Sequence, residues 1–204
     1  MLLSIHPVDP ETRKIQQVIQ VLLNGGVIAY PTDTIYGLGC DLLQPKAIER
    51  VCRIRKLDPQ KALLTLICRD ISQMAQYAHQ IDNEVFRIMK KNLPGPFTFI
   101  LRAGNQLPRT LKNRKGTIGV RMPDHRTTHA ILDALQRPML SATLHSDDDD
   151  TEYENDPEVI DEHFGNLVDL VIDGGIGGRI PSTVIDCTGE EPILIREGAG
   201  HLRY

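Results

Sequence analysis

The chain lacks the features from which a membrane span, a disulfide framework or a structural zinc site could be built. No uninterrupted apolar run approaches the roughly 20 residues that a membrane-spanning helix needs. The first ten residues lack the basic region and the long apolar core of a signal peptide. The only cysteines are irregularly spaced, without a CxxC pair, at Cys40, Cys52, Cys68 and Cys187. We therefore expect reduced, mostly buried thiols in a cytoplasmic protein with no membrane partner.

Two common signatures of nucleotide and nucleic-acid binding are missing as well. The sequence contains neither a Walker A loop nor a GxGxxG motif. Aromatic residues make up only 4% of the chain, too few for a platform on which single-stranded bases stack.

What is present indicates one globular domain over residues 1–204. The chain is 41% hydrophobic and 25% charged, with a net charge of −4, values close to globular averages. Ten of its acids lie between Asp147 and Glu162, a segment without Lys or Arg. Outside that segment 17 acids face 23 bases, a net charge of +6. Such a basic body suits a phosphate-bearing ligand, although a solvated surface would explain the same charges.

Hydrophobic periodicity predicts a mixed α/β chain. Helical spacing alternates with short apolar runs, but not strictly, so we expect a twisted mixed sheet with helices packed on it. Pro59 is expected to end the second helix. The predicted helices lie around residues 15–23, 47–52, 85–89 and 128–135, and the predicted strands at 27–30, 62–68, 97–101, 117–122, 139–142, 167–172, 182–186 and 193–196.

The most informative segment runs from Tyr30 to Gly39 and reads YPTDTIYGLG. It follows a predicted buried strand and precedes a predicted helix, where ligands usually bind in open α/β sheets. Two hydroxyls beside a carboxylate, followed by two glycines, would let the backbone approach a small polar ligand closely. A capped strand-to-helix turn remains the alternative interpretation.

Polar groups also mark later strands. Arg121 lies among apolar residues, where an unpaired charge is costly, so we expect it to face a cavity that holds an anion. The alternative is an edge-strand arginine that points into water. Ser182 and Thr183 begin another strand, and Arg196 ends the last one.

Five segments together resemble the YrdC/YciO family, in the family's own order. They read PTDTIYGLG (31–39), PGPFT (94–98), TIGVRMP (117–123), PSTVID (181–186) and IREG (195–198). The resemblance covers nearly the whole chain and implies a single-domain, twisted mixed sheet around a deep, positively charged cleft. It also implies the activity of threonylcarbamoyl-AMP synthase. That enzyme joins L-threonine, bicarbonate and ATP with Mg²⁺, releases pyrophosphate, and so serves the threonylcarbamoyladenosine modification of tRNA.

The resemblance also implies roles for individual residues. Thr32, Arg121 and Ser182 would contact threonine, and Tyr36 would help wall the pocket. Thr117 and Arg196 would lie along the nucleotide. ATP and Mg²⁺ enter as a substrate complex, so neither a tightly bound cofactor nor a resident metal is expected. Asp33 stands where the family motif has an acidic residue.

Two stretches depart from the synthase pattern and resemble the YciO branch more closely. At the KxR pair the chain reads Arg55-Lys56-Leu57, so the second basic residue is replaced by leucine. At the SxN triplet it reads Thr143-Leu144-His145. Arg55, Thr143 and His145 are the resulting nucleotide-binding candidates. Loss of one guanidinium from a triphosphate site could cost about 2–4 kcal/mol of transition-state stabilisation.

Two groups of residues could form metal sites, and each has a simpler interpretation. The acidic run Asp147–Asp156 could hold a divalent cation, but blocks of like charge favour a solvated loop. His125 and His129 are four residues apart on a predicted helix, yet no HExxH motif accompanies them.

A different class of function remains open, a module that binds double-stranded RNA or tRNA without synthase activity. Relatives of this family resemble such modules, and the basic body and four clustered bases favour it: Arg109, Lys112, Arg114 and Lys115. Contacts would be made to phosphate and shape, so affinity should fall steeply as salt rises.

Overall fold

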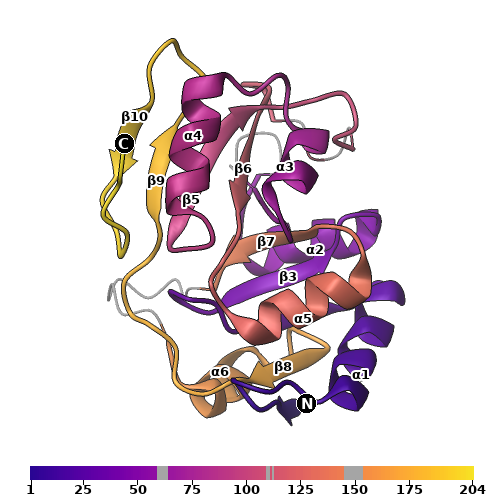
Figure 1. Ribbon diagram of the computed structural model, residues 1–204. Helices are drawn as coiled ribbons and strands as arrows, with labels where there is room; N and C mark the ends of the chain where they lie inside the picture. Colours follow the sequence, from indigo (N-terminus) through magenta and orange to yellow (C-terminus); the bar gives the residue numbers. More distant parts are fainter. Residues whose placement is uncertain (59–63, 109–110, 112, 145–153) are drawn as a thin grey trace.

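The computed structural model describes residues 1–58, 64–108, 111, 113–144 and 154–204. In these ranges ten strands form one mixed sheet in the order β1-β8-β2-β3-β7-β4-β6-β5-β9-β10. The sheet is strongly twisted, because β3 and β7 run at a steep angle to β5, β6 and β9 (Figure 1). The predicted α/β class and twisted mixed sheet are therefore confirmed.

The strands pair both ways along the sheet. Three successive pairs are antiparallel: β2 with β3, β3 with β7, and β7 with β4. Strand β4 pairs with β6 in parallel, and so does β5 with β9. The strand bounds are β1 Leu2–Ser4, β2 Val27–Tyr30, β3 Gly37–Asp41, β4 Thr65–Ile67, β5 Phe97–Arg102, β6 Thr117–Arg121, β7 Met139–Thr143, β8 Leu170–Asp173, β9 Thr183–Asp186 and β10 Ile193–Arg196.

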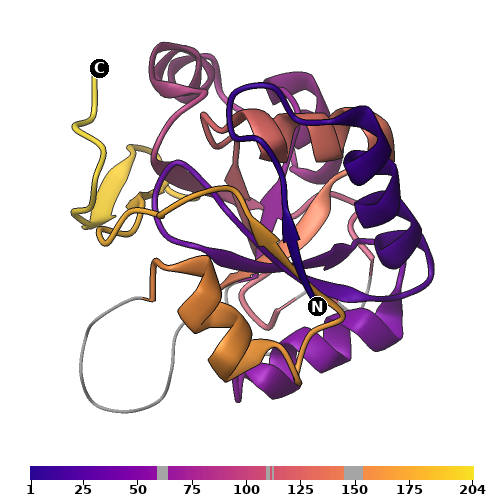
Figure 2. The ribbon, with the colours of Figure 1, turned by 90° about the horizontal axis from the view of Figure 1, so that it is seen from below.

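Helices cover the sheet unequally. The described residues include six of them: α1 Thr12–Leu23, α2 Pro45–Ile54, α3 Ile71–Tyr77, α4 Asn83–Asn92, α5 Arg126–Leu135 and α6 Pro157–Phe164. Figure 2 shows α1 and α5 on one side of the sheet and α2 and α6 on the other. None of the helices in the described ranges combines the length and apolar composition that crossing a membrane requires.

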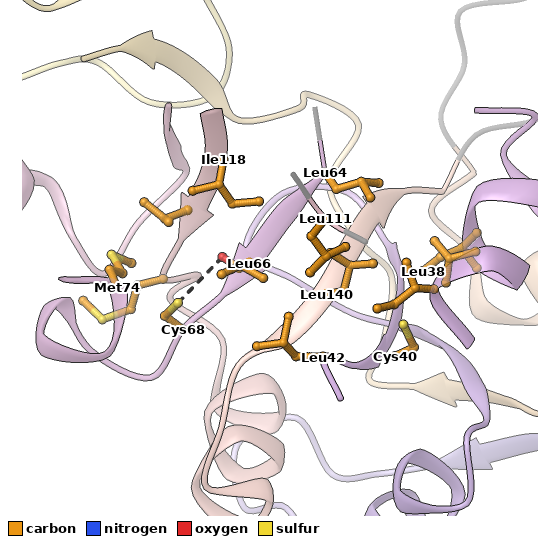
Figure 3. Close-up of a cluster of buried hydrophobic side chains, with 14 of the residues drawn as sticks. Leu38, Cys40, Leu42, Leu64, Leu66, Cys68, Met74, Leu111, Ile118 and Leu140 are labelled. Atoms are coloured by element: carbon orange, nitrogen blue, oxygen red, sulfur yellow. Dashed lines mark hydrogen bonds between the residues drawn. The ribbon is translucent and has the colours of Figure 1, made fainter. Parts of the chain in front are cut away.

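In β2, β4, β7 and β8, alternate residues enter two different cores. The larger core takes one set of strand residues together with apolar residues of α2, α3, α4 and α6. Leu66 and Leu140 lie in it (Figure 3). The smaller core joins the opposite face to α1 and α5 and includes Tyr30, Ile67 and Met139. This alternation is the period of two that a β-strand imposes on its side chains.

The face that α1 and α5 cover continues over β4, β6, β5 and β9 as a polar surface. Thr65, Arg121, Thr98 and Ser182 lie on or beside these strands, on the side opposite the larger core. This part of the sheet is where a ligand site can form, because among the described residues the smaller core does not extend over β5, β6 and β9.

The structure corrects several expected boundaries. Gly37–Asp41 is strand β3, so the motif segment before it lies inside an antiparallel hairpin with β2 and does not lead into a helix. Helix α2 ends at Ile54, before Pro59. Strand β4 is shorter than the predicted 62–68, whose first two residues lie outside the described ranges, and β8 begins at Leu170. Strand β1 and helices α3 and α6 were not predicted.

The larger core makes a first prediction. Leu66 is fully buried, so Leu66→Ala should lower the free energy of unfolding by about 2–5 kcal/mol through lost burial and a residual cavity. Urea denaturation measures the loss, and Leu43→Ala, at a side chain that is 58% exposed, is the control. Equal stabilities of the two variants would contradict the assignment of Leu66 to the core.

Candidate functional site

A cavity of about 270 Å³ opens on the polar face of the sheet. Strands β4, β5, β6, β7 and β9, the loop between β2 and β3, and the end of α2 all line it. Seven of the nine predicted site residues meet there: Thr32, Tyr36, Arg55, Arg121, Thr143, Ser182 and Arg196. Thr117 lines a neighbouring cavity, and His145 lies outside the described residues.

Arg121 is the most buried of the three arginines that line this cavity. Strand β6 lies between β4 and β5, so the edge-strand alternative is wrong. The guanidinium Nη2 donates to Asp33 Oδ1 at 2.6 Å and to Thr34 Oγ1 at 3.0 Å. Its Nε is buried and has no hydrogen-bond partner among the described residues. One edge of the guanidinium is thus anchored inside the protein, while another still lacks an acceptor.

The hydroxyl of Thr32 is occupied within its own loop. It donates to the Ile35 carbonyl oxygen at 2.7 Å and accepts the Thr34 backbone N–H at 3.1 Å. Thr34 Oγ1 lies 3.1 Å from it and already accepts from Arg121. Because Thr32 uses its own proton on the Ile35 carbonyl oxygen, the Thr34 hydroxyl donates to Thr32 Oγ1. The Thr32 hydroxyl thus has its one donor and both of its acceptor positions filled. As the loop stands, Thr32 shapes the cavity wall and has no free hydrogen-bonding position.

A glycine-rich connection between β8 and β9 fastens the same loop from outside. Tyr36 donates its phenol proton to the Gly175 carbonyl oxygen at 2.8 Å, and burial raises the pKa of this phenol to about 12. The Gly178 backbone N–H donates to the Thr34 carbonyl oxygen. A Cβ on Gly178 would lie 2.4 Å from that oxygen, so only glycine fits at this contact.

Further hydroxyl groups line the cavity. Ser182 Oγ lies 2.8 Å from Thr98 Oγ1, and Thr65 faces the cavity beside them. Ser141 and Tyr30 contribute a second hydroxyl pair. Thr65, Thr98, Ser141 and Tyr30 were not among the predicted site residues. Strand alternation could have indicated Ser141, because it shares one face of β7 with the predicted site residue Thr143.

A turn at the end of α2 places Arg55 and Leu57 beside the cavity. The Leu57 backbone N–H donates to Cys52 O, and the Lys56 backbone N–H donates to Arg53 O. Lys56 has a φ of 47°, so this is a Schellman ending with a non-glycine residue in the left-handed position. The turn brings Arg55 and Leu57 to the cavity. Leucine therefore occupies cavity wall at a position where the synthase pattern has a base.

A second cavity, of about 440 Å³, continues along the same face of the sheet. It is lined by Arg102, Lys115, Thr117 and Asp186, among others. Thr117 and Arg121 point to the same side of β6 four residues apart, about 13 Å at the usual rise of a strand. Thr117 is thus placed along the sheet from Arg121, not in the first cavity.

The described residues offer no cluster of metal-ligating side chains for either predicted metal site. Within the ranges described, no three His, Cys, Asp or Glu side chains gather closely enough to hold an ion. His125 stands at the N-cap position of α5 without a capping hydrogen bond from its side chain, and burial lowers its pKa. Of the acidic run, 147–153 lie outside the described residues, and Asp156 accepts the Glu158 backbone N–H as the N-cap of α6. The four cysteines are free thiols, and three are buried.

Comparison with known proteins gives consistent relatives. The family model Sua5/YciO/YrdC, with the description "Telomere recombination", matches residues 20–198. The YciO protein of Escherichia coli strain K12, described as uncharacterized, is 44% identical over 200 residues, 98% of this chain and 96% of that protein. An uncharacterized protein of Haemophilus influenzae is 43% identical over 197 residues, 96% of this chain and 94% of its own.

Solved structures agree with the sequence relatives. The crystal structure of E. coli YciO has a TM-score of 0.93 at 43% identity and covers 98% of this chain and 97% of that one. The crystal structure of P. abyssi Sua5 complexed with L-threonine has a TM-score of 0.88 at 26% identity. The similarity extends over 97% of this chain but only 57% of that Sua5 chain.

The buried ion pair makes a second prediction. Asp33→Asn removes the charge that compensates Arg121, and both side chains are about nine-tenths buried. The free energy of unfolding should fall by about 2–4 kcal/mol, because a buried guanidinium loses its counter-charge. Urea denaturation measures it against the exposed control Asp133→Asn. A loss no larger than that of the control would show that Arg121 does not depend on Asp33.

Proposed function

This chain belongs to the Sua5/YciO/YrdC family, and on that premise we propose that it is a threonylcarbamoyl-AMP synthase with a retuned nucleotide site. The proposed reaction joins L-threonine, bicarbonate and ATP, and releases pyrophosphate. Its product would serve the threonylcarbamoyladenosine modification of tRNA. The L-threonine complex of P. abyssi Sua5 supports threonine as the amino acid.

The observation that carries the proposal is the state of Arg121. Its guanidinium is held by Asp33, its buried Nε has no partner among the described residues, and it lines a cavity walled by hydroxyls. A carboxylate satisfies a guanidinium edge with charge-assisted hydrogen bonds. The α-carboxylate of an amino acid is therefore the ligand group that suits this position.

The nucleotide would occupy the remainder of the polar face. Arg55 and Arg196 line the first cavity, and Arg196 is steadied by donating to the Ser182 carbonyl oxygen at 2.8 Å. In this proposal both arginines meet the phosphates, and the nucleoside end extends toward Thr117 and the second cavity. The distance along β6 between Thr117 and Arg121 would then be spanned by the length of the nucleotide.

The chemistry needs positioning more than a reactive side chain. The unprotonated amine of threonine attacks the carbon of bicarbonate, and water is lost as the carbamate forms. A carbamate oxygen then attacks the α-phosphorus of ATP, and the bond to pyrophosphate breaks. Charge neutralisation and alignment are the tasks left to the protein. Arginines around a hydroxyl-lined cavity suit those tasks.

Leu57 is the reason to propose a retuned site. An apolar side chain in the cavity wall cannot stabilise the charge that develops on the phosphates. The alternative RNA-binding function stays a prediction, since Arg109 and Lys112 lie outside the described residues and Lys115 lines the second cavity.

A third prediction tests the proposed reaction. With threonine, bicarbonate and ATP·Mg²⁺, pyrophosphate release should require every component. Arg121→Gln should lower kcat/KM for threonine by about 30-fold or more, because a charge-assisted contact is lost. Arg87→Gln, on the exposed face of α4, is the matched control. Release that does not depend on threonine, or none from the unaltered protein, would rule the proposal out.

A fourth prediction concerns the departures from the synthase pattern. Leu57→Arg combined with His145→Asn should raise kcat/KM for ATP at least about tenfold, because a second cation joins Arg55 near the phosphates. Pyrophosphate release at varied ATP concentration measures the change. Leu57→Met, which keeps the wall apolar, is the control. No gain over that control would mean that these positions do not limit the reaction.

A further inference from the structure

Tyr30 lines the cavity, and the position of its ring depends on two glycines of the neighbouring strand. Its side chain is fully buried and lies across β3. A Cβ on Gly37 would come within 3.1 Å of the ring, and one on Gly39 within 2.9 Å. Both glycines belong to the YGLG part of the motif segment, so these positions leave room for the tyrosine ring.

The hydroxyl of Tyr30 reaches across β3 to strand β7. It donates to Ser141 Oγ at 2.7 Å, between residues 111 positions apart in the sequence. Burial raises the pKa of the Tyr30 phenol to about 12, so it keeps its proton at neutral pH. In the hydrogen bond with Tyr30, Ser141 Oγ accepts, and its own proton is left to be donated elsewhere. Among the described residues this proton has no acceptor, and Ser141 lines the cavity.

The direction of these protons selects the ligand group that Ser141 can meet. A serine whose oxygen already accepts from Tyr30 presents an O–H donor to the cavity, which suits a carboxylate oxygen far better than an ammonium group. Arg121 and Ser141 both line the first cavity. The donor at Ser141 and the guanidinium of Arg121 thus belong to one site.

We propose that Tyr30 is a positioning residue that orients Ser141, so that Ser141 donates a hydrogen bond to the carboxylate of the amino-acid substrate. This assignment rests on the proposed function, and it adds two residues to the amino-acid subsite. Tyr30 itself acts through Ser141. Its contribution is to ground-state binding of the amino acid, because the carboxylate carries the same charge before and after the reaction.

A double-mutant cycle between the two hydroxyls tests the assignment. Tyr30→Phe keeps the ring between the glycines and removes only the donor. Calorimetry should show threonine affinity weakened about tenfold, and KM should rise about as much while kcat stays within about twofold. Ser141→Ala should weaken binding at least as much. The double variant should be no worse than Ser141→Ala within about twofold, since Tyr30 acts through that serine.

Controls separate positioning from a structural role. Tyr204→Phe, at an exposed ring, should bind threonine like the unaltered protein, and ATP affinity should be the same in all variants. Unchanged threonine affinity in Tyr30→Phe or in Ser141→Ala, or additive losses in the double variant, would overturn the assignment. If the unaltered protein binds no threonine, the proposed function fails and the assignment fails with it. Threonine binding by the unaltered protein with an unaffected Tyr30→Phe removes only the assignment.

Discussion

A guanidinium buried on an interior strand is the constraint around which this molecule is arranged. Arg121 lies on β6, far from any sheet edge, where an uncompensated charge would be costly. Its counter-charge, Asp33, comes from a loop 88 residues earlier in the chain. The loop must therefore keep the conformation in which Asp33 compensates the charge of Arg121. The ion pair couples the stability of the fold to the shape of the cavity.

The other contacts of that loop extend the same constraint. Thr32 satisfies its hydroxyl internally, Tyr36 is bonded to Gly175, and Gly178 donates to Thr34. A wall fixed in this way before a ligand arrives loses little conformational entropy on binding. Preorganisation of this kind suits a reaction that needs alignment more than a nucleophile. The twisted sheet supplies the open face, and the connection between β8 and β9 supplies the outer support.

The residues of the site could be predicted from the sequence more completely than the strands and helices of the fold. Apolar runs identified β2, β5 and β6, but β3 was missed because Gly37 and Gly39 are typical of a loop. Helix α6 was missed because acidic residues obscured the apolar pair Ile160 and Phe164 four residues apart. The motifs identified seven residues that line one cavity. No local pattern, however, could reveal a contact such as that between Tyr30 and Ser141. Such contacts depend on strand register, which tertiary packing decides.

For the proposed reaction, the distribution of charge indicates where each of the two substrates would bind. Asp33 neutralises Arg121 in the cavity, so that region can accept one carboxylate but not a polyphosphate. The remaining cations, Arg55 and Arg196, are more exposed and stand at the end of α2 and of β10. An amino acid therefore suits the interior and a triphosphate the outer part, with the reacting carbamate between them. Because Leu57 contributes no charge there, neutralisation of the phosphates in the proposed reaction would fall to these two arginines and to the cation that accompanies ATP. A site arranged in this way can retain its preference for the amino acid while losing rate at the nucleotide, since the two demands are met by different residues.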